Sequence, residues 1–345
     1  MANKDTFCSK IFYHEEINPW AKTVPCCLIR PTDADIDKMR TQLLNGERPI
    51  ECKTCWDLED KSIESDRQIK NKSLDFYLDR DIEKIEEDCK NENYSTKTVK
   101  IAISNLCNAT CVNCNSGLSS AWATLRKEKT FTIVDQTKID SIDWGGLVML
   151  SFVGGEPLID KKVFATLEKM IELGNTDCFI DMVTNGSVEL TTKQIETLNK
   201  FNNVQMVLSI DGIEKRFEYM RYPLKWNKLL DNIDLFKELG FSLAISYTVS
   251  NVNAMYYNET IDWFNKQGIP HNTNPVTEPL YFSPQCLPVE VKKKIDVPFI
   301  NSENHITAHD EQFIKACQEL REQDQLKEID IADYLPEFNE VMENG

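Results

Sequence analysis

Three cysteines, Cys107, Cys111 and Cys114, form the pattern CxxxCxxC directly after an apolar run at residues 99–104. Cysteine thiolates are the usual protein ligands of iron–sulfur clusters. Three thiolates leave one iron of a four-iron cluster without a protein ligand, and a catalytic metal site needs such an open position. A structural zinc site would need a fourth ligand, and the sequence places no His nearby. The pattern predicts a catalytic iron–sulfur cluster, with zinc as the alternative.

A second group of thiols precedes the first one. Cys8 is followed by the adjacent pair Cys26 and Cys27, and then by Cys52 and Cys55 in a CxxC pattern. Four thiolates from separate segments can enclose one complete iron–sulfur cluster or one zinc ion, because CxxC is found in both kinds of site. Spacing alone does not decide between Cys26 and Cys27 as the ligand.

The distribution of the twelve cysteines favours metal binding over disulfide formation. Only Cys178, Cys286 and Cys317 lie beyond residue 114, whereas cysteines used as apolar filler would be spread more evenly. Cys178 opens an apolar run, and we expect it to pack in the core. The first ten residues lack the basic and apolar segments of a signal peptide, and no stretch approaches the roughly 18 apolar residues of a membrane span. We therefore expect a cytoplasmic protein without membrane contact, in whose reducing compartment thiols bind metals.

The charge balance limits the partners of the protein. The chain has 56 acidic and 39 basic residues, for a net charge of −17. Such a surface repels phosphate backbones, so a nucleic-acid partner is disfavoured. Hydrophobic residues make up 41% of the chain, enough to form a substantial core.

The elements that must position these thiols follow an alternating pattern. Short apolar runs typical of buried parallel strands lie at 99–104, 148–153, 178–183, 204–210 and 243–249, with a weaker one at 274–282. Helical patterns lie between them at 160–174, 191–201, 226–240 and after 253. This alternation predicts a parallel sheet with right-handed crossovers. On pattern alone, a partial barrel and an open doubly wound sheet both remain possible.

With these motifs in place, the chain resembles the radical S-adenosylmethionine (radical SAM) superfamily, whose signature is CxxxCxxC after the first strand. The segment Gly154-Gly155-Glu156-Pro157 follows the second run and is similar to the superfamily's GGE motif, whose backbone binds the methionine amino group. Further residues that match cofactor-binding positions are Asn185 after the third run, Ser209 and Asp211 after the fourth, and Arg221 near the methionine carboxylate. The superfamily's GxIxGxxE pattern is not legible at 246–254, so no adenine contact is assigned.

The N-terminal cysteines and their neighbours resemble an auxiliary-cluster module of the twitch or SPASM type. The resemblance implies a second [4Fe-4S] cluster on Cys8, Cys26, Cys52 and Cys55, with Cys26 chosen because such modules use a VPC-like ending. The implied fold is α/β: a partial (β/α)6 TIM-like barrel at 96–285, the N-terminal Cys-rich module at 1–95 and a C-terminal helical tail at 286–345.

The resemblance also implies an activity. A [4Fe-4S] cluster on Cys107, Cys111 and Cys114 would cleave S-adenosylmethionine reductively, giving a 5′-deoxyadenosyl radical that abstracts hydrogen from a substrate. The electrons would come from a reductant such as flavodoxin or ferredoxin. The substrate would be a ribosomal peptide or protein, with a sugar or another small molecule as the alternative. A function of another class is a non-enzymatic, zinc-stabilised binding protein.

Overall fold

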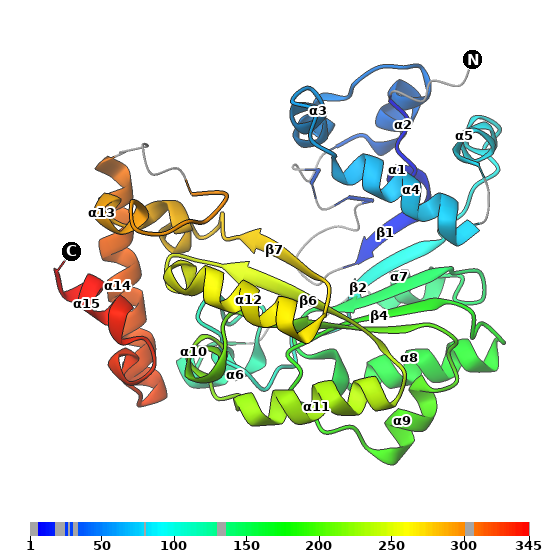
Figure 1. Cartoon of the computed structure of the whole chain (residues 1–345). Coiled ribbons are helices and arrows are strands. Elements are labelled where there is room, and N and C mark those ends of the chain that lie inside the picture. The colour runs from blue at the N-terminus through cyan, green and yellow to red at the C-terminus, as the bar shows by residue number, and fades with distance from the viewer. Residues whose placement is uncertain are drawn as a thin grey trace.

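The computed structural model describes residues 6–17, 25–26, 28–29, 34–78, 81–129, 136–300 and 307–344. Seven parallel strands form one sheet in the order β1-β2-β3-β4-β5-β6-β7. The strands are β1 (His14–Ile17), β2 (Thr98–Ala102), β3 (Met149–Val153), β4 (Phe179–Thr184), β5 (Val204–Ser209), β6 (Ser242–Val249) and β7 (His271–Pro275). The sheet curls into a half-barrel with helices along its outer side (Figure 1). The expectation of a partial TIM-like barrel is confirmed.

The two edges of the sheet differ from the expectation. Strand β1 was not predicted, because its four residues, HEEI, include two carboxylates and no apolar run; it pairs with β2 from His14↔Thr98 to Ile17↔Ile101. Strand β7 begins before the weak run at 274–282. The later part of that run instead forms the 3-10 turn η4 (Leu280–Phe282).

The four predicted helical patterns are confirmed. They form α8 (Lys161–Glu172), α9 (Thr192–Leu198), α11 (Trp226–Glu238) and α12 (Tyr257–Gln267). Thr191 caps α9 in a capping box with Gln194, which satisfies donors that the first helical turn leaves free. Further short helices on the loops are α6 (Ser120–Arg126), α7 (Gln136–Ser141) and α10 (Glu214–Met220).

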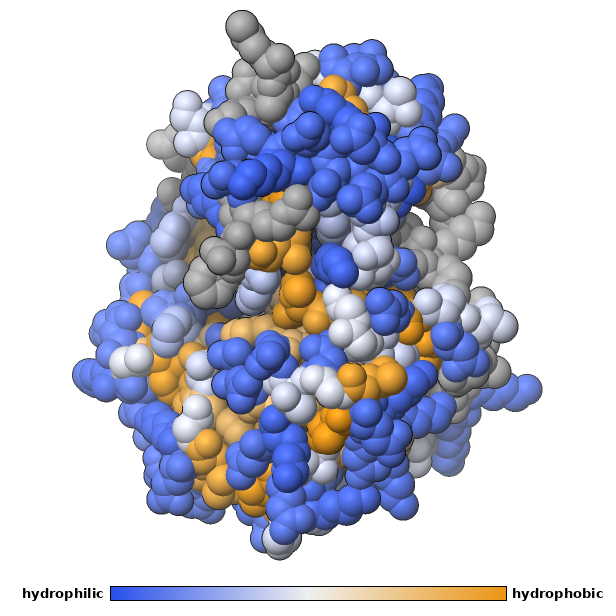
Figure 2. Space-filling view, turned by 90° about the vertical axis from the view of Figure 1, so that its right-hand side faces the viewer, coloured by the Kyte–Doolittle hydropathy of each residue, from blue (hydrophilic) through white to orange (hydrophobic). Residues whose placement is uncertain are grey.

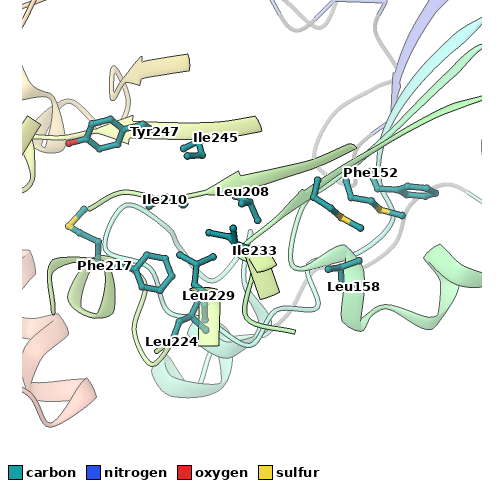
Figure 3. Close-up of a cluster of buried hydrophobic side chains, with 14 of the residues drawn as sticks. Phe152, Leu158, Leu208, Ile210, Phe217, Leu224, Leu229, Ile233, Ile245 and Tyr247 are labelled. Carbon is teal, nitrogen blue, oxygen red and sulfur yellow. The ribbon is translucent and has the colours of Figure 1, made fainter. Parts of the chain in front are cut away.

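The main core lies between the outer face of the sheet and these helices. Alternate strand residues point outward, as in β3, where Leu150 and Phe152 are fully buried. Figure 3 shows the middle of this core, where Leu208 of β5 faces Leu229 and Ile233 of α11. Cys178 belongs to this core, as expected. The outer face of the sheet is thus apolar.

The N-terminal region has a separate small core. Its elements are α1 (Lys10–Tyr13), α2 (Ile36–Leu44), η1 (Ile50–Cys52), α3 (Lys53–Glu59), α4 (Asp66–Leu78) and α5 (Ile82–Lys90). Phe7, Leu43 and Trp56 are among the side chains buried in it. Figure 1 shows these helices above the β1 edge of the sheet, and Figure 2 shows their outer surface as mostly hydrophilic.

The C-terminal part packs on the other end of the barrel. It contains α13 (Val289–Lys292), α14 (Thr307–Lys327), η6 (Ile331–Asp333) and α15 (Pro336–Asn344). The predicted helical extension is confirmed. Phe313, Leu320 and Phe338 from these helices are buried in the main core, so the extension packs against the barrel. Across the described ranges, no helix is both long and apolar enough to cross a bilayer.

Candidate functional site

The three cysteines of the CxxxCxxC pattern lie on one loop, residues 103–119, which we call the Cys loop. The start of α6 holds the middle of the loop: the backbone N–H of Cys107 donates to Ser120 Oγ at 3.0 Å, and Trp122 Nε1 donates to the carbonyl of Cys111 at 2.9 Å. The loop also bonds to the last residue of α10, where the N–H of Val112 donates to Met220 O at 2.9 Å. These bonds fix the loop at the carboxyl end of β2.

The thiols of the Cys loop lie close enough to influence one another. Burial, followed by the neighbouring Cys111 thiol, raises the pKa of Cys107 to about 11 and that of Cys114 to about 12. Both polar side-chain atoms of Asn113 are buried and have no hydrogen-bond partner among the described residues. Three neighbouring thiols beside unsatisfied polar atoms fit a group that takes three thiolates as ligands.

The turn after β3 fits tightly against the Cys loop. Gly154 and Gly155 have φ of +77° and +49°, which L side chains rarely adopt. A Cβ on Gly155 would lie 2.3 Å from the carbonyl oxygen of Leu106, and one on Gly154 would lie 2.6 Å from the Cβ of Ala102. The turn can therefore pack against the end of β2 and against the Cys loop only because both residues lack side chains.

Glu156 is turned into the protein. Its backbone N–H donates to Leu106 O at 2.7 Å, and its carboxylate accepts bonds from Thr184 Oγ1 and from the N–H of Asn185, both at 2.7 Å. Burial raises the pKa of this carboxyl group, although these donors oppose the shift. Glu156 thus ties the Cys loop to the end of β4, and Pro157 begins the turn η2 (Pro157–Ile159) beyond it.

Asn185 continues this connection. Its Nδ2 donates to Asn108 Oδ1 of the Cys loop at 2.8 Å, and Asn108 Nδ2 donates in turn to Ser187 Oγ at 2.9 Å. The loop after β4 is therefore bonded to the Cys loop between its first two cysteines. The sequence placed Asn185 at the site but did not predict its partner Asn108.

Asp211 and Arg221 form a buried ion pair beside the thiols. Arg221 Nη2 lies 2.8 Å from Asp211 Oδ2, and Arg221 Nη1 lies 3.8 Å from Cys111 Sγ. Burial opposes the guanidinium charge, but Asp211 and then Cys111 outweigh it and raise the pKa of Arg221. Arg221 Nε remains buried without a partner in the described structure. A fixed cation with a spare donor thus faces the Cys loop, while Ser209 is half-buried at the end of β5.

Helix α14 braces the Cys loop from outside, which sequence reasoning missed. Gln323 Nε2 donates to Val112 O at 3.1 Å, and Lys327 Nζ donates to Gln323 Oε1 at 3.0 Å. Lys327 Nζ also lies 4.8 Å from the ring centroid of Trp122, and burial lowers its pKa to about 8. The only signal was the i, i+4 spacing of these polar residues, which does not name a partner.

The second set of thiols lies in the N-terminal region. Cys8, Cys26, Cys52 and Cys55 line one small pocket, together with Arg67. Burial, and then the Cys8 thiol, raises the pKa of Cys52 to about 12.

Arg67 holds the segments around this pocket together. It lies 2.6 Å from Glu59 in an ion pair and donates to Phe7 O at 2.6 Å. Its guanidinium also lies 4.9 Å from the ring centroid of Trp56. Arg67 therefore ties the segment of Cys8 to the helix that carries Cys55.

The remaining cysteines lie elsewhere. Cys27 is outside the described residues, and the buried cysteines away from both sets are Cys89, Cys178, Cys286 and Cys317. Within the described ranges, no three or more His, Cys, Asp or Glu side chains are grouped so that they could hold a metal ion as they stand. The thiols of both sets would therefore have to turn toward a bound cluster.

Comparison with known proteins gives one family match, in the central region of the chain. Residues 101–264 match the model of the Radical SAM superfamily, and no curated protein matches the chain. Among solved structures, polyhistidine-tagged anSMEcpe with bound AdoMet is 21% identical with a TM-score of 0.44, over 57% of this chain and 55% of that one. SuiB of Streptococcus suis bound to S-adenosylmethionine is 15% identical with a TM-score of 0.38, over 76% of this chain and 60% of that one. The chain thus spans little more than half the length of the first of these.

Replacing Gly155 with Ala should destabilise the protein and displace the Cys loop, because the new Cβ would collide with Leu106 O. Gly174→Ala is the matched control: its φ is +76°, but nothing lies within 4 Å of its Cβ position. We expect a loss of about 1 kcal/mol for the control and at least about 2 kcal/mol more for Gly155→Ala, from urea unfolding. Equal losses would mean that the close approach does not constrain the loop.

Replacing Gln323 with Ala should weaken the brace on the Cys loop, because the carbonyl of Val112 would lose its side-chain donor. We expect a loss of about 1–3 kcal/mol in the free energy of unfolding. Gln325→Ala, two residues along α14 on an exposed position, should change it by less than about 0.5 kcal/mol. If the two variants unfold at the same urea concentration, α14 does not support the loop.

Proposed function

On the premise that residues 101–264 form a radical SAM domain, we propose that this chain cleaves S-adenosylmethionine at an iron–sulfur cluster held by Cys107, Cys111 and Cys114. The observation that carries the proposal is the gathering of these thiols on one loop, beside the Asp211–Arg221 ion pair and the Gly154-Gly155 turn. A cluster bound there would supply one electron to the sulfonium of S-adenosylmethionine, giving methionine and a 5′-deoxyadenosyl radical that abstracts hydrogen from the substrate.

The chain's own residues would bind and orient S-adenosylmethionine. The backbone of Gly154 and Gly155 would bind the methionine amino group, as the backbone of the similar GGE motif does. Arg221 keeps a buried Nε without a described partner, and a guanidinium is suited to a carboxylate such as that of methionine. Asp211 holds Arg221 in place through an ion pair, with 2.8 Å between Asp211 Oδ2 and Arg221 Nη2. Glu156 acts as a positioning residue, since Thr184 and Asn185 occupy its carboxylate.

The N-terminal thiols would hold a second, auxiliary cluster in a twitch- or SPASM-like module at 1–95. Supporting this is the single pocket that Cys8, Cys26, Cys52 and Cys55 line, far along the chain from the Cys loop. Four thiolates complete the ligand set of a [4Fe-4S] cluster, so no iron there would be open. A zinc ion is the alternative occupant, because four thiolates also suit zinc.

The partners follow from this chemistry. A one-electron reductant such as flavodoxin or ferredoxin would be needed. Because enzymes with such a module often modify ribosomal peptides or proteins, a peptide is the favoured substrate, and a sugar or another small molecule is the alternative.

Anaerobic reconstitution with iron and sulfide tests the cleavage reaction. With dithionite and S-adenosylmethionine, the chain should form 5′-deoxyadenosine, and Cys114→Ala should lose this activity because the cluster loses a ligand. The matched control is Cys178→Ala, which removes a thiol buried in the core and should keep it. Zinc in both sites, with no 5′-deoxyadenosine from the unaltered chain, would identify a zinc-stabilised binding protein instead.

The double variant Cys52→Ala/Cys55→Ala tests the auxiliary site separately. It should bind about four fewer iron ions per chain than the unaltered protein, because one [4Fe-4S] cluster is lost. S-adenosylmethionine cleavage without substrate should persist, since the Cys loop keeps its three thiols. Iron analysis and 5′-deoxyadenosine assays measure both quantities. Loss of all iron would argue for one shared site, and unchanged iron would argue against an auxiliary cluster.

A further inference from the structure

The inner face of the half-barrel carries a row of polar side chains at one level. Each of the strands β1 to β5 contributes one residue to it, and the register pairs each with the next: Glu16, Lys100, Ser151, Asp181 and Gln205. The residues before and after them along the strands, such as Val99 and Ile101, are buried on the outer face. Burying such a polar row in an apolar core would cost free energy, because its groups would lose their hydrogen bonds to water. The row therefore indicates a surface that contacts a polar partner or ligand.

A pocket of about 380 Å³ lies over this row, and we call it the lumen pocket. The sheet supplies Lys100, Ser151 and Asp181 to its lining, and α4 supplies Lys70 and Tyr77. Figure 1 shows α4 running across the end of the sheet where β1 and β2 lie. The volume is in the range of small-molecule sites, so the lumen pocket can take one amino-acid-sized group.

Two carboxylates of the row each have one oxygen without a hydrogen-bond partner among the described residues. Asp181 is 9% exposed and accepts a bond from Ser151 Oγ at 2.7 Å on one oxygen, while its Oδ1 is buried and accepts none from the described residues. Glu16 lies 3.3 Å from Lys100 Nζ on one oxygen, and its Oε2 is likewise buried and unpaired within the described structure. Buried carboxylate oxygens are normally satisfied, so these call for a donor from a ligand.

A cation without a fixed partner faces the same pocket. Lys70 makes no hydrogen bond or ion pair with any residue that the structure describes, whereas Lys10 is paired with Asp66 at 3.0 Å and Lys100 with Glu16. His14 adds no charge, because burial and then the surrounding lysines lower its pKa to about 3. The lumen pocket therefore presents one ammonium group without a hydrogen-bond partner among the described residues and one half-satisfied carboxylate.

We propose that the lumen pocket binds a small zwitterion of the amino-acid type, with its anionic group on Lys70 and its ammonium group on Asp181. This inference rests on the proposed function, because we take the zwitterion to be part of the substrate from which the radical abstracts hydrogen. It narrows the substrate to one that presents both charges within an amino-acid-sized volume. A substrate that is only an anion would leave Asp181 unpaired, and a neutral polyol would leave Lys70 unpaired.

Saturation-transfer NMR on the full chain tests this with three probes: the mixed protein amino acids, glutarate as a pure dianion, and glucose as a neutral polyol. We expect signals from amino acids and weaker or no signals from the other two. Lys70→Gln and Asp181→Asn should each weaken binding about tenfold or more, since each removes a charge-assisted hydrogen bond. The matched control is Lys72→Gln on the same helix, whose side chain is 76% exposed and should bind as the unaltered chain does.

Other outcomes overturn the proposal. Tighter binding of glutarate or glucose, no binding of any probe, or binding that survives Lys70→Gln would each do so. Lys70 is only half-buried, so its variant keeps the test valid even if Asp181→Asn fails to fold. The proposed function fails separately: formation of 5′-deoxyadenosine without zwitterion binding contradicts only this inference, and zwitterion binding without 5′-deoxyadenosine contradicts only the cleavage reaction.

Discussion

The site depends on one close approach between two backbones. The turn at Gly154 and Gly155 contacts the Cys loop so closely that a Cβ at Gly155 would stand 2.3 Å from Leu106 O. The adjacent N–H of Glu156 then bonds to the same carbonyl at 2.7 Å, and the Glu156 carboxylate reaches the end of β4. Since β3 and β4 are central strands with a fixed register, the loop that carries the thiols is bonded to the middle of the sheet.

The sequence predicted the central strands because their outward residues are apolar. It did not reveal that their inward residues form a polar row. Each run contains a polar residue, such as Lys100, Ser151 or Asp181, and single polar residues do not change the reading of a short apolar run. They become a row only when the register aligns them, and the register pairs residues that lie 24 or more positions apart in the sequence. Strand β1 was missed for a related reason: its burial comes from pairing with β2 and not from its own composition.

The candidate site was predictable where the chemistry lies in local spacing. CxxxCxxC, the adjacent glycines and the CxxC pair are legible because the ligands follow one another within a few residues. The brace from α14 was not legible, because Gln323 and Val112 are 211 residues apart and amide-to-carbonyl bonds leave no pattern in sequence. Arg221 was predicted to face a carboxylate of the cofactor; the structure adds Asp211 as the charge that keeps this buried guanidinium in place.

The pocket of the N-terminal thiols and the lumen pocket share one short segment of the chain. Cys8, helix α1 and strand β1 follow one another within ten residues. This one segment therefore carries a thiol, residues that line both pockets, and a strand of the sheet. Lys10 and Asp66 line both the pocket of the N-terminal thiols and the lumen pocket, and their ion pair of 3.0 Å separates the two. Lys10 is almost fully buried, so moving Asp66 away would weaken the stabilisation of a buried charge. Any rearrangement around the N-terminal thiols that moves this pair must therefore also reshape the wall of the lumen pocket.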